Sequence, residues 1–400
     1  KALVDRPRST FVSADGRLLA RGTKVAQMGL ADGDFITLVL RPNLHAYFIP
    51  SSADVMLVCD TTRGEVSAID TSRLSGSSSK WDCAVELEGK IYGLPGNANC
   101  MLVYDTTTGE VSSIDISGVA TCDLKWDSAV VVEGKIYGLP RSAECLLVYD
   151  TNTGEVSSID TSGVATGPWK WISAIAIKDK IYGPPGVAEC ILVFNIKTGE
   201  VSSIDISDLR FGGVMWDSAV AVEGKIYALP RSADCFLIYD TETGDVSGID
   251  TSDLAMGHWK WISVVAVDGK IYGLPSIAEC LFVYDTKTGA VSSIDTSGVA
   301  TGIFKWDSAV VVEGRIYGLP RSAECLLVYD TKTGEVFGID TSTVATGSNK
   351  WKSAFAVEGR IYGMPHTADC VLVYDTQKGE VSGIDASEFQ TGDDLWRKAL

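Results

Sequence analysis

The sequence contains few of the residues and motifs that carry chemistry. Its 400 residues include only three histidines, at unrelated positions, so no histidine-based metal cluster is indicated. It holds no G-x-S-x-G nucleophile motif, no phosphate-binding loop and no dinucleotide-binding glycine motif. No run approaches the ~18 consecutive apolar residues of a membrane-spanning helix. We therefore expect no enzyme activity, no cofactor or metal, and no membrane partner.

Basic side chains are also scarce. Lysine and arginine number 34 against 52 aspartates and glutamates, which leaves a formal net charge of −18. A chain this acidic repels the phosphates of nucleic acids and of anionic lipids. Nucleic acid is therefore not expected as a partner.

What the sequence does contain is a repeat with a fixed period of 45 residues. Seven full copies occupy 81–395, and residues 126–170 show the motif best. An eighth, partial copy lies at 45–70. Each full copy starts with one tryptophan, and so does the partial segment 396–400. The series is Trp81, Trp126, Trp171, Trp216, Trp261, Trp306, Trp351 and Trp396. A period of this length is typical of stacked supersecondary units.

Within a copy, four short runs rich in Val, Ile and Tyr alternate with turn residues, and no helical periodicity is present. In the copy that starts at Trp126 the runs are a (128–132), b (135–139), c (145–150) and d (155–160). Glu133-Gly134 predicts a two-residue hairpin loop between a and b. Between c and d, the Asp150 carboxylate can accept turn amides and Gly154 can adopt positive φ. The runs are therefore predicted to be strands joined as a meander.

In runs a and c, the residues that point to each of the two faces of the sheet are apolar. The sheet must therefore be covered on both faces. Run d is half polar, as an outermost strand would be. Radially packed blades satisfy both conditions, and the fold class is predicted to be an all-β propeller of four-stranded blades. The partial first copy lacks run a, and residues 396–400 begin a run a without a run b, so we favour eight blades over seven. Residues 36–41 are an alternative first strand.

The repeat resembles the kelch motif over residues 45–400. The matching segments are 128–132, Lys135-Ile-Tyr and Val148-Tyr-Asp150, although Leu139-Pro140 replaces the kelch diglycine. The resemblance implies a kelch-like propeller, which we place at 43–400. Kelch-like topology puts the b–c loops and the d–a connections at the same end of the ring.

Residues 11–41 resemble the second half of a ubiquitin-like domain. The matching segments include Phe11-Val-Ser-Ala-Asp-Gly, Gly29-Leu-Ala-Asp-Gly33 and Ile36-Thr-Leu-Val-Leu-Arg41. The resemblance implies a partial ubiquitin-like β-grasp segment at 1–42. Because Pro42 stands where ubiquitin has its terminal diglycine, conjugation is not expected.

Ten cysteines are present, and seven of them share one repeat position at the start of run c. Equivalent positions in neighbouring blades lie about 10 Å apart, too far for a disulfide. We interpret these seven as small buried hydrophobic residues: Cys100, Cys145, Cys190, Cys235, Cys280, Cys325 and Cys370. Free thiols suit a reducing compartment, which favours a cytoplasmic or nuclear protein. Since the chain starts at Lys1 and stops within a repeat, we expect a fragment whose targeting signals are missing.

The candidate partner contacts lie two residues before the tryptophans. Apolar side chains recur there, usually followed by a lysine at 125, 170, 260 or 305, and they are Leu124, Trp169, Val214, Trp259 and Phe304. Exposed apolar residues interleaved with lysines would favour protein–protein contact at the b–c/d–a end. The alternative is that these side chains fill the grooves between blades.

Charged residues alternate from blade to blade at two positions. Arginine in the b–c loop occurs together with aspartate after the tryptophan, in the pairs Asp127/Arg141, Asp217/Arg231 and Asp307/Arg321. Copies with Ile172 or Ile262 lack the arginine, while one copy keeps Asp82 opposite Gly96. We predict structural Arg–Asp pairs with bidentate geometry, and a second role for these arginines in partner contact. His366, in the b–c loop of the last full copy, is a further candidate contact.

Three functions are compatible with these patterns. The first is a non-catalytic protein–protein interaction scaffold that uses the b–c/d–a end, with the propeller a monomer inside a complex. The second is a substrate receptor in a ubiquitin–proteasome pathway. The third is a propeller that binds carbohydrate or catalyses a reaction in its central channel. The uniform length of the copies argues against one privileged pocket and favours the first function.

Overall fold

The computed structural model describes residues 9–12, 37–40, 45–209, 216–389 and 396–399. Its regular structure is β-strand, together with two short 3-10 helices at Ser207–Leu209 and Ser387–Phe389. Among these residues no helix is long and apolar enough to cross a membrane. The chain divides into two compact units, one containing 1–46 and 59–65 and the other containing 47–58 and 66–400.

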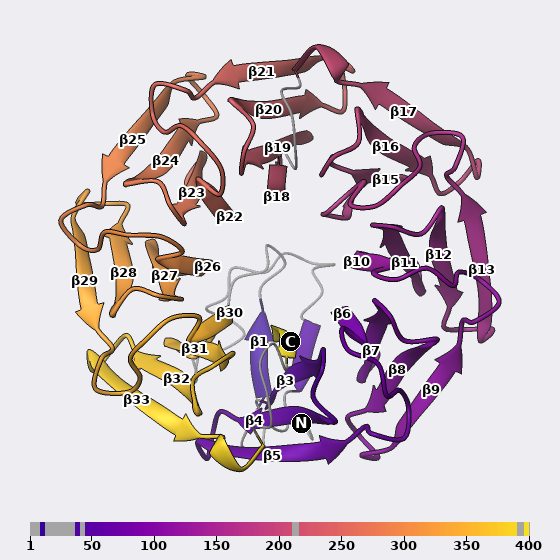
Figure 1. Cartoon of the computed structure of the whole chain (residues 1–400), viewed down its shortest axis with the longest axis horizontal. Coiled ribbons are helices and arrows are strands. Elements are labelled where there is room, and N and C mark those ends of the chain that lie inside the picture. Colours follow the sequence, from indigo (N-terminus) through magenta and orange to yellow (C-terminus); the bar gives the residue numbers. More distant parts are fainter. Residues whose placement is uncertain (1–8, 13–36, 41–44, 210–215, 390–395, 400) are drawn as a thin grey trace, which may run out of the picture. The chain divides into compact units, whose positions relative to one another are not determined.

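Within the described residues, eight four-stranded sheets form the blades of a propeller (Figure 1). The first strands are β34 (Trp396–Ala399), β6 (Trp81–Leu87), β10 (Trp126–Val132), β14 (Ile175–Ile177), β18 (Trp216–Val222), β22 (Trp261–Val267), β26 (Trp306–Val312) and β30 (Trp351–Val357). The second are β3 (His45–Pro50), β7 (Lys90–Pro95), β11 (Lys135–Pro140), β15 (Lys180–Gly183), β19 (Lys225–Pro230), β23 (Lys270–Pro275), β27 (Arg315–Pro320) and β31 (Arg360–Pro365). The third are β4 (Val55–Asp60), β8 (Cys100–Asp105), β12 (Cys145–Asp150), β16 (Cys190–Asn195), β20 (Cys235–Asp240), β24 (Cys280–Asp285), β28 (Cys325–Asp330) and β32 (Cys370–Asp375). The fourth are β5 (Glu65–Asp70), β9 (Val111–Asp115), β13 (Glu155–Asp160), β17 (Val201–Asp205), β21 (Val246–Asp250), β25 (Val291–Asp295), β29 (Val336–Asp340) and β33 (Glu380–Asp385).

The first strands lie towards the centre of the ring and the fourth strands form its outer rim, as β18 and β21 show (Figure 1). The eight-bladed, all-β prediction is therefore confirmed. We refer below to the four strands of every blade as a, b, c and d, from the centre of the ring to its rim.

The ring closes through the C-terminal strand. β34 pairs antiparallel with β3, with Ile49 opposite Lys398 and Phe48 opposite Ala399, and so supplies strand a of the first blade. The alternative that 36–41 supplies this strand is wrong, because residues 396–399 occupy that edge of β3. β2 (Thr37–Leu40) instead pairs with β1 (Ser9–Val12) in a separate two-stranded sheet. Most of the segment that resembles a ubiquitin-like domain, residues 13–36, lies outside the described residues.

Both predicted turn types are present. Glu133 and Gly134 have φ values of 50° and 74°, as a type I′ hairpin requires at its two central positions. In the c–d turn, Asp150 Oδ1 accepts the Asn152 amide at 2.9 Å, and Gly154 has a φ of 73°. Thr151 Oγ1 then donates to Gly134 O at 2.6 Å and joins the two turns. The a–b and c–d turns therefore lie together at one end of the blade.

The repeated tryptophan is a core residue. All seven tryptophans that start the copies from 81 to 351 are fully buried. Each indole Nε1 donates to the carbonyl oxygen of the cysteine 19 residues later, at 2.8–3.1 Å. The indole therefore connects strand a to the start of strand c in its own blade and satisfies its single polar group, as buried tryptophans usually do.

Glycine in strand b lets neighbouring blades approach. A Cβ built on Gly318 would lie 2.6 Å from Leu274 Cδ1 of the preceding blade and 3.4 Å from Trp306 Cγ. One blade has Ala228 at this position, and there the preceding blade has Pro184 in place of leucine. Proline has no amide hydrogen for the sheet, and β14 and β15 are correspondingly short.

Overpacking at this contact should destabilise the propeller. We expect Gly318→Ala to lower the free energy of unfolding by about 1–3 kcal/mol, because the added methyl group must displace Leu274. Gly163→Ala is the matched control, since Gly163 has open space around its Cβ position. Urea denaturation of the two variants measures the difference. Equal stability of the two variants would show that this contact does not limit the approach of the blades.

Candidate functional site

The b–c loops and the d–a connections meet at one end of the propeller, opposite the turns described above. In the copy that starts at Trp126 the loop is 141–144, and the connection that follows is 161–170. Lys170 N donates to Arg141 O of the preceding blade at 2.9 Å, and Lys170 O accepts the Gly186 amide of its own blade at 2.7 Å. Equivalent lysine amides at five other junctions bond to the preceding loop in the same way. We call this surface the b–c/d–a end.

The structure brings the alternating arginines and aspartates together. The Nη1–Oδ1 distances are 3.3 Å for Arg141–Asp127, 2.9 Å for Arg231–Asp217 and 3.2 Å for Arg321–Asp307. Each aspartate lies in a β-bulge directly after the tryptophan of strand a, which redirects its side chain. One guanidinium nitrogen makes each contact, so the bidentate geometry that we predicted is wrong. Arg141 Nη1 also lies 3.9 Å from Asp82 Oδ2, which gives the exceptional aspartate a cation from the next blade.

Aromatic rings cover the other side of these guanidinium groups. The Arg141 Cζ atom lies 3.4 Å from the centroid of the Trp169 ring, and Arg231 Cζ lies 3.0 Å from that of Trp259. Cation–π contacts of this kind prefer tryptophan. We did not anticipate them from the sequence, yet a signal exists, because the tryptophan follows the arginine by 28 residues in both cases.

The third arginine has a different pair of neighbours. Arg321 Cζ lies 4.8 Å from the Phe304 ring, and Arg321 Nε donates to Asn349 Oδ1 at 2.8 Å. Asn349 stands 28 residues after Arg321 and so takes the place that tryptophan has at the other two sites. His366 lies beside it, with its Nδ1 3.0 Å from Asn349 O. Contacts within the protein, with aspartates, aromatic rings and Asn349, thus hold all three guanidinium groups in place.

The remaining candidate contacts are only partly exposed. Leu124 is half-buried and its amide donates to Asn97 Oδ1 at 2.7 Å. Val214 lies outside the described residues. Trp259 and Phe304 are half-buried and form an edge-to-face pair with centroids 5.5 Å apart, whereas Trp169 is 38% exposed. These side chains are therefore partly buried and partly exposed, and their contact with a partner stays a prediction.

The same end carries two strongly exposed apolar side chains that the sequence analysis did not select. Met256 is 83% exposed and Ile303 is 62% exposed, and each lies in a d–a connection close to Trp259 or Phe304 in sequence. We call Met256, Trp259, Ile303 and Phe304, from two adjacent d–a connections, together with Trp169 from a separate connection, the apolar patch. Among the described residues, the other exposed large hydrophobic side chain is Val311, which is 37% exposed and lies within strand a.

The lysines do not interleave with this patch at the surface, contrary to our prediction. Lys170 and its equivalents are 1% exposed, and Lys170 Nζ donates to Ala143 O at 2.8 Å and to Gly167 O at 2.9 Å. Carbonyl oxygens replace water around the ammonium group, which makes its burial tolerable. Desolvation nevertheless lowers the pKa of Lys170, Lys260, Lys305 and Lys350 below the usual lysine range.

Burial also perturbs the aspartates of the ion pairs. Desolvation raises the pKa of Asp217, although Arg231 opposes the shift. It raises the pKa of Asp307 to about 6, despite the attraction of Arg321. Desolvation likewise lowers the pKa of Arg231. For Asp217 and Asp307, the desolvation cost of the charged carboxylate thus exceeds its attraction to the arginine, as expected for buried ion pairs.

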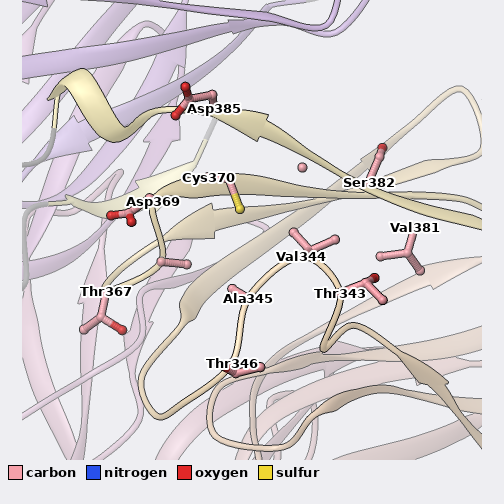
Figure 2. Close-up of a pocket in the computed structure, with 12 residues that line it drawn as sticks. Thr343, Val344, Ala345, Thr346, Thr367, Asp369, Cys370, Val381, Ser382 and Asp385 are labelled. Carbon is pink, nitrogen blue, oxygen red and sulfur yellow. The ribbon is translucent and has the colours of Figure 1, made fainter.

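A groove lies between neighbouring blades next to the cysteine of strand c. Beside Cys370 it encloses about 650 Å³, with Thr343 and Val344 on one side and Val381 and Ser382 on the other (Figure 2). A similar groove of about 850 Å³ lies beside Cys325. Both occur where strand d has glycine, Gly383 or Gly338, opposite the thiol, and most other blades have serine there.

The cysteines at this position are less buried than predicted. Cys190 is buried, whereas the six equivalent cysteines are half-buried, because the thiol lies at the edge of the groove between blades. Burial raises the pKa of Cys190, Cys235 and Cys370 to about 11. These thiols are therefore protonated at neutral pH and are poor nucleophiles and poor metal ligands. All ten cysteines are free.

In the part of the chain that the structure describes, no group of three or more His, Cys, Asp or Glu side chains could hold a metal ion.

Comparison with known proteins shows the architecture alone. No protein family matches the chain, and no curated protein is similar to it in sequence. Its structure is similar to that of AztD from Citrobacter koseri, with a TM-score of 0.59 and 11% identity over 89% of this chain and 97% of AztD. It is also similar to dihydro-heme d1 dehydrogenase NirN in complex with DHE, with a TM-score of 0.62 and 14% identity over 94% of this chain and 78% of NirN. For U3-55K the TM-score is 0.50, with 9% identity over 78% of this chain and 92% of U3-55K. These similarities show an eight-bladed β-propeller.

The raised pKa of Asp307 has a measurable consequence for stability. The folded protein holds the proton more tightly than the unfolded chain, whose pKa is near 3.8. The contribution of Asp307 to stability is therefore fully present below about pH 4, and it is lost as the pH rises to about 6. Relative to Asp307→Asn, we expect the wild-type protein to lose up to about 3 kcal/mol across this window.

Urea denaturation between pH 4 and pH 7.5 measures this difference. Asp160→Asn is the matched control, because the amide and hydroxyl of Ser162 lower the pKa of Asp160 and reverse the sign of its pH dependence. Parallel pH profiles for the wild-type protein and Asp307→Asn would contradict the assignment.

Proposed function

We propose that the protein is a non-catalytic interaction scaffold that binds a protein partner through its b–c/d–a end. The observation that carries the proposal is the apolar patch, whose members Met256 and Ile303 are 83% and 62% exposed. Exposed apolar clusters with aromatic members are typical of protein–protein interfaces. The buried core of the blades does not need these side chains.

The aromatic members of the patch are also preorganised. Trp169, Trp259 and Phe304 have φ values of 61°, 60° and 52°, in the left-handed region that bulky residues avoid. Each such residue costs on the order of 1–3 kcal/mol. Ser79, Leu124 and Asn349 have the same conformation at this position, so the blade junction imposes it and thereby orients the rings. Stacking on an arginine then fixes the ring before a partner arrives. Rigid aromatic anchors lose little entropy on binding.

The kelch-like interpretation of the repeat belongs to this proposal. The meander order of the strands supports it, as does the meeting of b–c loops and d–a connections at one end. No kelch diglycine is needed for this arrangement, because Leu139-Pro140 continues strand b at that point.

A second candidate function is that of a substrate receptor in a ubiquitin–proteasome pathway. One observation favours it. β1 and β2 lie at the two ends of the segment that resembles a ubiquitin-like domain, and they pair with each other rather than with a blade. In this function the N-terminal segment would engage the degradation machinery while the propeller selects the substrate. Co-purification of proteasome or cullin subunits with the chain tests it, and loss of those subunits when residues 1–42 are deleted is the expected result.

The scaffold proposal is tested by placing charge in the apolar patch. We expect Met256→Glu/Ile303→Glu to abolish partner capture, because a carboxylate in an apolar interface loses its water without gaining a partner. Both side chains are exposed, so we expect the stability to change by less than about 0.5 kcal/mol. The measurement is affinity capture from lysate followed by quantitative mass spectrometry.

The matched control places the same charge at the opposite end of the propeller. Asn152→Glu/Gln377→Glu changes two exposed c–d turn positions, at which another blade already carries Glu242. A partner of the proposed kind is retained by the wild-type protein and by this control, and is lost with Met256→Glu/Ile303→Glu. Identical capture profiles for all three baits would overturn the proposal.

A further inference from the structure

The exposed charge of the b–c loops is acidic, while the d–a connection of the first blade carries the exposed Arg73. The residue just before strand c is an exposed carboxylate in seven of the eight blades, and the eighth has Asn99. These residues are Asp54, Glu144, Glu189, Asp234, Glu279, Glu324 and Asp369, and we call them the acidic ring. Repetition of a carboxylate at one position of the loop distributes negative charge around the whole end.

The cations of this end do not neutralise that charge at the surface. Arg141 and Arg231 are buried between an aspartate and an indole ring. The lysines of the d–a connections are 1% exposed, and the ammonium groups of Lys170 and Lys350 bond to main-chain carbonyl oxygens. The exception is Lys80, whose Nζ lies 3.2 Å from Asp54 Oδ1 and pairs with that member of the acidic ring. A partner that approaches this end therefore meets carboxylates and apolar side chains.

At three junctions the buried lysine bonds to the residue just before a carboxylate of the acidic ring. Lys170 Nζ donates to Ala143 O at 2.8 Å, and these two residues are the chain neighbours of Trp169 and Glu144. The same bond recurs between Lys260 and Ala233 and between Lys305 and Ala278. The resulting pairs of acid and ring are Glu144 with Trp169, Asp234 with Trp259, and Glu279 with Phe304. Each aromatic anchor is thus next in sequence to a lysine that bonds beside a ring carboxylate.

We propose that the b–c/d–a end binds a lysine- or arginine-rich amphipathic segment of a partner protein. The inference rests on the proposed scaffold function and adds the chemistry of the partner. Apolar residues of the segment contact the apolar patch, and its cations face the acidic ring. Charge complementarity of this kind accelerates association and excludes acidic competitors. It also makes the affinity depend on salt.

The test uses three synthetic 15-residue peptides as probes. The first has leucine and phenylalanine at positions i, i+3, i+4 and i+7 and lysine elsewhere. The second replaces every lysine with glutamate, and the third keeps the lysines but replaces the apolar residues with serine. Fluorescence anisotropy with the whole chain measures the binding of each peptide at low and at physiological salt. We expect binding of the first peptide alone, weakened as the salt concentration rises.

Two matched variants separate this site from general attraction to an acidic protein. Glu144→Gln/Asp234→Asn/Glu279→Gln removes three charges from the acidic ring, and we expect about tenfold or greater loss of affinity. Glu133→Gln/Glu223→Gln/Glu313→Gln removes three exposed charges from the a–b turns at the opposite end, and we expect affinity within about twofold of wild type. Equal weakening by the two sets would overturn the inference, as would binding of the serine peptide or failure of the first peptide to bind.

The outcome is distinguishable from failure of the scaffold proposal itself. A captured partner that depends on Met256 and Ile303, but on none of the three ring carboxylates, would remove the inference and leave the scaffold function standing.

Discussion

Lysine precedes six of the eight repeat tryptophans, and at these junctions it ties its blade to the one before it. Its amide donates to the b–c loop of the preceding blade, and its carbonyl accepts from the loop of its own blade, as at Lys170. Its ammonium group is buried among carbonyl oxygens at the same junction. An ammonium group buried without such partners would cost several kcal/mol, so the loop and the connection must keep this geometry. The same bonds recur at six described junctions and connect neighbouring blades at the b–c/d–a end.

This constraint also sets the conformation of the residue before the lysine. To bring the lysine inwards, the chain adopts positive φ at that residue, whether it is Ser79, Leu124, Trp169 or Asn349. The side chain then lies over the b–c loop of the preceding blade, where Arg141 and Arg231 provide a flat cation to stack on. The aromatic anchors of the proposed interface are thus placed by the same contact that joins the blades. A substitution that changes the junction between two blades therefore also moves the aromatic side chains of the proposed interface.

Periodicity made much of the fold predictable. The 45-residue spacing of tryptophan, the Glu133-Gly134 hairpin and the Asp150 turn depend on contacts within one repeat, and such contacts are visible in a local pattern. The Arg–Asp pairing could be inferred because both residues vary together from copy to copy. The orientation of the lysines could not be inferred, since a lysine beside an aromatic residue in sequence looks the same whether its ammonium group meets water or carbonyl oxygens.

The sequence by itself determined the blade, the number of blades and the end at which loops and connections meet, because these follow from repeat length, turn chemistry and hydrophobic alternation. Only the tertiary structure decided which charges remain at the surface. It buried the lysines and two of the arginines and left the carboxylates before strand c in solvent. Burial is a property of the junction between two blades, and neither repeat alone contains the carbonyl oxygens and rings that surround those cations.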